Sequence, residues 1–169
     1  MSPRNIVLKI AAVLVPLIML SVAGITLFNK GSGKQWITVA SADERKHVIL
    51  PDCTQIWLGT GAEISYPKNM EEHRLVRSKG DVYFEVAKNG TKFRVDAGTS
   101  FIQVMGTKFL VENSSDSITR VVVDEGRVLF YAKNKERNQL NLTAGERGML
   151  YNDEKRIIKE VEPSKNAAA

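Results

Sequence analysis

Apolar and polar residues alternate one by one through most of the chain after Trp36, which is the pattern of strands with one buried face. The alternation is clearest over residues 82–86 and 93–97, on either side of the turn-forming pair Asn89-Gly90. An Asn-Gly pair between two such runs predicts a hairpin. Helical periodicity is almost absent from this part of the chain.

Shorter alternations predict further strands around Ile102 and Phe109. Residues 118–123 and 127–132 flank Asp124-Glu125-Gly126, which predicts a second hairpin. A tight turn is expected to begin at Pro51-Asp52, and an exposed loop is expected over the polar residues 133–138. Two further strands are expected, at Leu140 and Leu142 and at Met149 and Tyr151, with a turn at Gly145-Glu146-Arg147-Gly148 between them. A last strand is expected to end with Ile157 and Val161.

Strands that recur about every ten residues with Gly, Asn and Asp between them indicate an all-β domain of the sandwich, jelly-roll or short β-roll type. No long crossover separates the strands, which argues against an α/β fold. Trp57, Phe84 and Phe109 lie in apolar alternation, and we expect them in the core, together with Tyr83 and Val86.

The N-terminal part has a different pattern. Residues 10–28 form an uncharged apolar run of 19 residues, which as a helix would span roughly 28 Å, close to the thickness of the bilayer hydrocarbon. The run predicts one transmembrane helix. A cleaved signal peptide is the alternative, because Ser21-Val22-Ala23 resembles a cleavage site, but apolar residues continue beyond it to Phe28.

Charge follows the same division. The net charge is +5, but residues 1–34 contain four basic and no acidic side chains, and the remaining 20 basic side chains are balanced by 19 acidic ones. The excess therefore suits lipid headgroups, and no basic stripe is left for nucleic acid. We expect a cytoplasmic tail at 1–9, a transmembrane helix at 10–28, a linker at 29–35, a β domain outside the cytoplasm at 36–162 and a disordered tail at 163–169.

Residues that could carry chemistry do not gather in the sequence. His47 and His73 lie apart, with no ligand at metal-site spacing, and Cys53 is the only cysteine. Adjacent carboxylates such as Asp124 and Glu125 point to opposite faces of a strand and form no acid–base pair by themselves. We therefore expect no enzyme activity, no cofactor and no metal.

Six segments in register resemble the FecR domain. Val48-Ile-Leu-Pro-Asp-Cys-Thr-Gln-Ile-Trp-Leu is similar to its "LPDG-S/T-x-VWLN" opening, and residues 62–67, AEISYP, resemble its next strand. Residues 74–88 resemble its "GEAYFEV" core, and the segment from Val104 resembles "V-x-GT-x-F-x-V". Residues 122–128 and Leu142-Thr-Ala-Gly145 resemble the last two motifs. Cys53 and Gly59 stand where the family usually has Gly and Asn.

The residues that carry this resemblance are read mainly as scaffold, because turns and core positions explain many of them without a ligand. They are Leu50, Pro51, Asp52, Trp57, Leu58, Tyr66, Pro67, Gly80, Tyr83, Phe84, Glu85, Val86, Gly106, Thr107, Phe109, Gly126 and Gly145.

The resemblance implies a transmembrane regulator of the bacterial inner membrane, with its β domain at 36–162 in the periplasm, that catalyses no reaction. FecR-like proteins relay a signal from the signalling domain of a TonB-dependent outer-membrane transporter to an ECF-type sigma factor and so control transcription. The family's sigma-binding segment precedes the membrane helix, and here only residues 1–9 do. A fragment of a longer regulator and a shortened member working through other chains both stay open. So does a membrane-tethered binding or scaffold module without direct sigma-factor contact.

Overall fold

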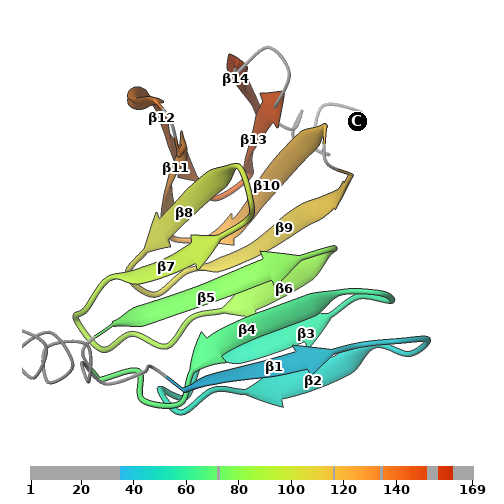
Figure 1. Cartoon of the computed structure of the whole chain (residues 1–169). Coiled ribbons are helices and arrows are strands. Elements are labelled where there is room, and N and C mark those ends of the chain that lie inside the picture. Colours follow the sequence, from blue (N-terminus) through green and yellow to red (C-terminus); the bar gives the residue numbers. More distant parts are fainter. Residues whose placement is uncertain (1–34, 72, 116, 134, 152–155, 162–169) are drawn as a thin grey trace, which may run out of the picture. The chain divides into compact units, whose positions relative to one another are not determined.

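The computed structural model describes residues 35–161 except 72, 116, 134 and 152–155, and these residues form two facing β-sheets (Figure 1). Sheet A contains, in spatial order, β1 (Trp36–Ala40), β4 (Glu63–Pro67), β5 (Arg74–Lys79), β7 (Phe93–Asp96), β8 (Ser100–Val104), β11 (Arg127–Ala132) and β12 (Lys135–Thr143). Sheet B contains β2 (Lys46–Ile49), β3 (Gln55–Leu58), β6 (Val82–Glu85), β9 (Lys108–Ser115), β10 (Ile118–Glu125), β13 (Glu146–Tyr151) and β14 (Arg156–Val161).

The all-β prediction is confirmed: the described residues contain two layers of strands and no helix. Accordingly, a helix long and apolar enough to span a bilayer is not found within the described ranges. The expected transmembrane helix at 10–28, its flanks and the tail from 163 lie outside the described residues.

Successive strands of the chain are added from one end of the sandwich to the other. Strands β1 and β2 form one end of the two sheets, and later strands are added in sequence order, as the colours in Figure 1 show. A hairpin within one sheet is usually followed by a crossing to the other sheet. Strand β6 crosses alone, and its neighbours in sequence, β5 and β7, therefore pair in parallel in the opposite sheet.

Both hairpins predicted at Asn89-Gly90 and Asp124-Glu125-Gly126 are wrong. The strands on either side of each turn, β6 and β7, and β10 and β11, lie in different sheets. Turn residues allow the chain to reverse, but they do not specify whether the next strand pairs with the last or packs against it. Phe84 and Phe93 meet edge to face across the core, with ring centroids 6.2 Å apart.

Two polar segments were assigned wrongly. The loop expected at 133–138 ends early, because β12 begins at Lys135, and the turn expected at 145–148 ends before Glu146, where β13 begins. Strand β12 is the edge of sheet A, and edge strands carry polar and charged residues readily. The last predicted strand is present as β14.

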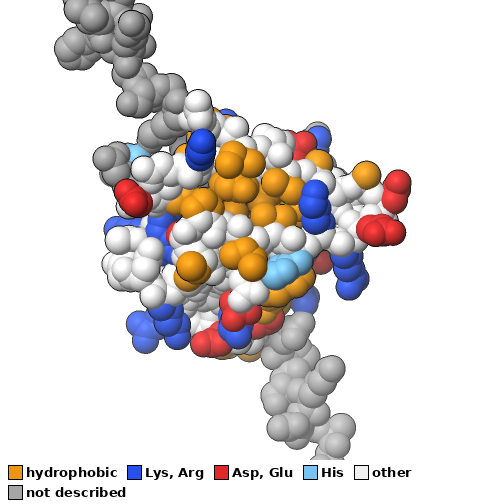
Figure 2. Space-filling view, turned by 90° about the horizontal axis from the view of Figure 1, so that it is seen from below, with side chains coloured by type: hydrophobic (Ala, Val, Ile, Leu, Met, Phe, Trp, Pro, Cys, Tyr) orange, Lys and Arg blue, Asp and Glu red, His pale blue; other side chains and the backbone are white. Residues whose placement is uncertain are grey.

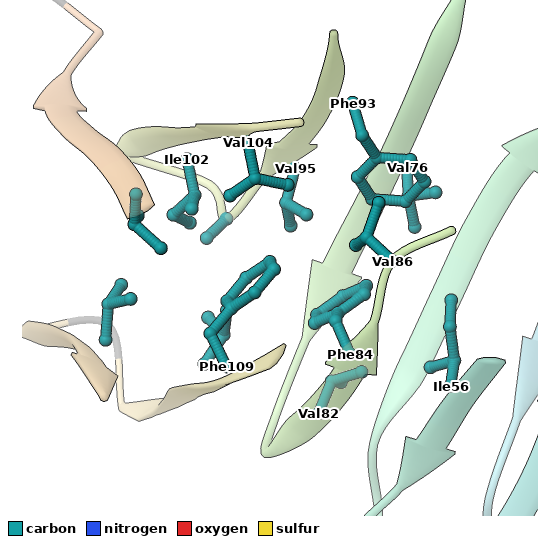
Figure 3. Packing of buried hydrophobic residues seen from close by; sticks show 14 of the residues in the cluster. Ile56, Val76, Val82, Phe84, Val86, Phe93, Val95, Ile102, Val104 and Phe109 are labelled. Atoms are coloured by element: carbon teal, nitrogen blue, oxygen red, sulfur yellow. The ribbon is translucent and has the colours of Figure 1, made fainter. Parts of the chain in front are cut away.

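The core fills the space between the inner faces of the two sheets. Phe84 and Phe109 stack with ring centroids 5.1 Å apart, and both are completely buried (Figure 3). Trp57 and Tyr83 were expected in the core, and this is wrong for both: each is half-buried on the outer face of sheet B. Their sequence neighbours Ile56 and Phe84 take the inner positions, and adjacent residues of a strand cannot share a face.

Candidate functional site

The most elaborate polar cluster of the described residues surrounds Arg74, the first residue of β5. Its side chain is 1% exposed, and it forms an ion pair with Asp52, whose side chain is 5% exposed. The guanidinium also stacks over the ring of Phe93, 5.1 Å from its centroid. It donates hydrogen bonds to Asp52 Oδ2 (2.7 Å), Asn89 Oδ1 (2.7 Å), Ala87 O (2.9 Å), Thr91 O (3.1 Å) and Thr54 Oγ1 (3.2 Å).

Asp52 is held by the turn between β2 and β3. Its carboxylate accepts hydrogen bonds from the backbone N–H and the hydroxyl of Thr54, both at 3.0 Å. The turn predicted at Pro51-Asp52 is present and is closed by a bond from Cys53 N to Leu50 O at 3.0 Å. Cys53 itself is exposed and has a φ of 65°, in the left-handed region.

The cluster therefore fastens three segments that are distant in sequence: the β2–β3 turn, the start of β5 and the β6–β7 crossing. Burying a guanidinium is favourable only when its donors are satisfied, and here carboxylate, amide and carbonyl oxygens satisfy them. No nucleophile is aimed at a reacting position in this arrangement. The cluster holds these three segments in fixed positions relative to one another.

A groove of about 360 Å³ opens beside the same turn, at the ends of β3, β6 and β10. Its charged side chains pair with one another. Lys108 bridges Glu85 at 3.1 Å and Glu125 at 3.7 Å, and Lys88 lies 3.6 Å from Glu125. The hydrogen bond to Glu85 raises the pKa of Lys108. The groove is lined by Cys53, Gln55, Glu85, Val86, Ala87, Lys88, Gly106, Thr107, Lys108 and Glu125.

An apolar and aromatic row crosses the outer face of sheet B. We call it the outer row, and it consists of five residues paired strand to strand: His47, Trp57, Tyr83, Leu110 and Val122. The His47 and Trp57 rings stack at 4.7 Å, and Tyr83 meets Trp57 edge-on at 5.8 Å. The outer row shows that sheet B presents large side chains on both faces.

Tyr83 fixes the outer row to a neighbouring carboxylate. Its hydroxyl donates a hydrogen bond of 2.9 Å to Asp124. Burial, followed by that hydrogen bond and the nearby negative charge, raises the pKa of Tyr83 to about 12. The phenol is therefore a proton donor throughout the physiological pH range.

The residues singled out in the sequence do not gather at one point. Leu50, Leu58, Tyr66, Phe84, Val86 and Phe109 are core residues. Gly80, Gly106, Gly126 and Gly145 occupy turn positions with positive φ. Pro67 lies in β4 opposite Trp36 of β1, and Pro51 is exposed in the β2–β3 turn. The hydroxyl of Thr107 donates a hydrogen bond of 3.0 Å to Arg127 O. Only Asp52 joins the buried cluster, while Trp57, Tyr83 and Glu85 lie on the outer face of sheet B.

Arg74 was the residue that sequence reasoning missed. The signal was available, because Arg74, Val76 and Ser78 alternate with outward-facing residues and so place a guanidinium on a core face. An inward arginine requires several buried acceptors. Across the described ranges no three His, Cys, Asp or Glu side chains come together as a metal site would require.

Comparison with known families gives a direct assignment. The model of the family described as FecR protein matches residues 37–129, more than half of the chain. The chain belongs to the FecR family. The family resemblance drawn from the sequence segments is thus confirmed, and the match runs from the second residue of β1 to the third residue of β11.

Solved structures agree with the family assignment. One crystal structure of a candidate anti-sigma factor from Parabacteroides distasonis ATCC 8503 has a TM-score of 0.69 and 26% identity, covering 76% of this chain and 61% of that chain. A second structure bearing the same description has a TM-score of 0.68 and 27% identity, with 75% and 60% covered. This FecR chain therefore spans about three fifths of the length of these structures. A comparison with curated proteins found no match.

Proposed function

We propose that this FecR chain is the periplasmic sensor of an anti-sigma regulator held in the bacterial inner membrane by residues 10–28. The observation that supports it most is the FecR match over residues 37–129, together with the candidate anti-sigma factors among similar structures. The 19-residue uncharged run before the domain supports the membrane location. The regulator passes a signal from the signalling domain of a TonB-dependent transporter to an ECF-type sigma factor.

The outer row is the surface we propose for the transporter's signalling domain. Its half-buried Trp57 and Tyr83 are residue types enriched at interfaces, and the half-buried Leu110 beside them adds apolar area. Ion pairs flank the row on both sides, Glu85 with Lys108 and Glu112 with Arg120 at 2.8 Å. Because each of these flanking charges already has an opposite charge beside it, a partner can cover the row without separating either pair.

The test is transcription from a promoter of the cognate sigma factor in cells that carry the transporter. Leu110→Lys places a charge in the outer row, and Leu129→Lys places the same charge on the outer face of sheet A, where Leu129 is also half-buried. We expect Leu110→Lys to abolish the response to the inducer and Leu129→Lys to preserve it. Co-purification with the signalling domain should show the same difference.

Deleting the gene separates this function from a scaffold role. A regulator changes transcription of the sigma factor's targets when it is removed, whereas a tethered scaffold leaves it unchanged. Unchanged transcription, with the start of the gene confirmed, would count against the proposal.

A further inference from the structure

The free edge of β1 differs from the other edges of the two sheets. The sheets described here end in β1 and β12 and in β2 and β14. Natural proteins protect such edges with charged side chains. Strand β1, Trp36-Ile-Thr-Val-Ala40, has no charged residue, whereas the sequences of the other three edge strands contain Lys46 (β2), Lys135, Glu136 and Arg137 (β12), and Arg156, Lys159 and Glu160 (β14).

The end of the sandwich beside β1 is also apolar. Ile37 and Val39 pair with Tyr66 and Ile64 of β4 and share their inward-facing side. No further strand of the described residues covers them, and Ile37 is 36% exposed. Figure 2, viewed from the side of β1 and β2, shows hydrophobic side chains gathered in one patch with charged side chains around it.

The hydrogen bonds between β1 and β4 show which backbone N–H and C=O groups of β1 are left without a partner on β4. Gln35 O accepts from Lys68 N at 2.8 Å, and Ser41 N donates to Ala62 O at 2.8 Å, so both ends of this stretch are hydrogen-bonded to the β4 side. In an antiparallel pair the bonded residues alternate. The N–H and C=O groups of Trp36, Thr38 and Ala40 therefore point away from β4, to the open edge.

We propose that β1 pairs with β1 of a second copy of this chain, antiparallel about a two-fold axis through Thr38. Thr38 then exchanges hydrogen bonds with Thr38 of the second copy, and Trp36 exchanges them with Ala40. Ile37 lies opposite Val39, which continues the apolar interior from one sandwich to the next. A large side chain meets a small one at Trp36, and no like charges within β1 are brought together.

The size of the contact sets its strength. A five-residue strand is about 17 Å long and packed sheets lie about 10 Å apart, which gives a contact on the order of a few hundred Å². That is below the roughly 800 Å² per partner of a standard stable interface. The pair therefore forms and dissociates with protein concentration.

Disulfide trapping of the full chain in detergent tests the axis. A Cys53→Ser background removes the exposed native thiol, and Thr38→Cys then places two thiols across the two-fold axis. Residues in a hydrogen-bonded antiparallel pair have Cα atoms about 5.5 Å apart, within the range that a disulfide spans. The matched control is Ser65→Cys in the same background, because Ser65 lies beside Thr38 on β4, one strand from the edge.

We expect mild oxidation to give a covalent dimer with Thr38→Cys and not with Ser65→Cys. Equal yields from the two variants, or a Thr38→Cys variant that becomes linked only to a different protein, would overturn the proposal. Sedimentation gives a second measurement. Thr38→Lys should weaken self-association at least tenfold, by about 1.4 kcal/mol, because it brings two ammonium groups together. Ser65→Lys should leave it unchanged, and an equal loss in both variants would contradict the β1 pairing.

Discussion

At the scale of single residues, Arg74 is the side chain whose loss we expect to cost most. Arg74→Ala leaves the buried carboxylate of Asp52 without its cation and removes donors from Asn89 and the Ala87 carbonyl. Breaking one partner of a buried ion pair typically costs about 3–5 kcal/mol of unfolding free energy. Urea denaturation followed by circular dichroism measures this change.

The control for that loss is Arg77→Ala, in the same strand. Arg77 is exposed, and its guanidinium lies over the ring of Trp36 at 4.3 Å. An exposed cation–π contact contributes on the order of 0.5–1 kcal/mol. Similar losses in the two variants would mean that the Arg74 cluster has no special role in stability.

Cys53 occupies a backbone conformation that suits glycine. At a φ of 65°, a residue with a Cβ carries a cost on the order of 1–2 kcal/mol. Cys53→Gly should therefore raise the free energy of unfolding by a few tenths to about 1 kcal/mol, after the greater chain entropy of glycine is subtracted. Cys53→Ala removes the thiol but keeps the Cβ, and thermal unfolding should show no comparable gain. A destabilised Cys53→Gly variant would contradict this account.

Tyr83 should make stability depend on alkaline pH. Its pKa is about 12 in the folded chain against about 10 in an unfolded one, so the folded state holds the phenolic proton more tightly. That contribution is fully present below pH 10 and is lost as the pH rises from about 10 to 12. Absorbance titration should show a tyrosine transition near pH 12 that disappears in Tyr83→Phe. In Asp124→Asn the transition should move down only in part, because burial is the larger cause.

At the scale of elements, the crossings between the sheets are the connections most sensitive to substitution. Gly80 links β5 to β6 with a φ of 79°, and a Cβ there would lie 2.9 Å from the Cα of Ala62. Gly90 has a similar φ of 78° but open space around it. Gly90→Ala should cost about 1 kcal/mol, and Gly80→Ala at least about 1 kcal/mol more, because a backbone atom cannot move aside. Equal losses in chemical denaturation would show that the close approach does not matter.

The same elements show what the sequence can predict. Alternation located β6, β7, β10 and β11 well, because a strand with one buried face has a period of two. It could not assign strands to sheets, since a strand facing its neighbour across the core has the same pattern as a strand paired with it. Tyr83 was placed in the core because it is aromatic, although the alternation that turns Phe84 inward turns Tyr83 outward. Of the candidate site residues, Asp52 was located at a turn, but its contact with Arg74, 22 positions away, is a tertiary feature.

At the scale of the whole molecule, the two sheets share one continuous core. The buried apolar cluster runs from Leu50 to Leu150 and includes strands of both sheets along the sandwich. Each crossing also ties one sheet to the other. A domain built in this way should unfold cooperatively, because an end cannot separate without exposing the core of the next strand pair.

The two tryptophans allow that cooperativity to be tested. Trp36 in β1 and Trp57 in β3 both lie near the β1–β2 end, whereas far-ultraviolet circular dichroism reports on strands throughout the domain. We expect the segment 35–161 to give the same denaturation midpoint by tryptophan fluorescence and by circular dichroism. A fluorescence midpoint at lower denaturant than the circular-dichroism midpoint would mean that the β1–β2 end opens by itself. Arg74→Ala would then increase the difference between the two midpoints, because the Arg74 cluster fastens the β2–β3 turn to β5. With a single cooperative unit, Arg74→Ala should instead lower both midpoints together, because a loss at one edge is shared by the whole core.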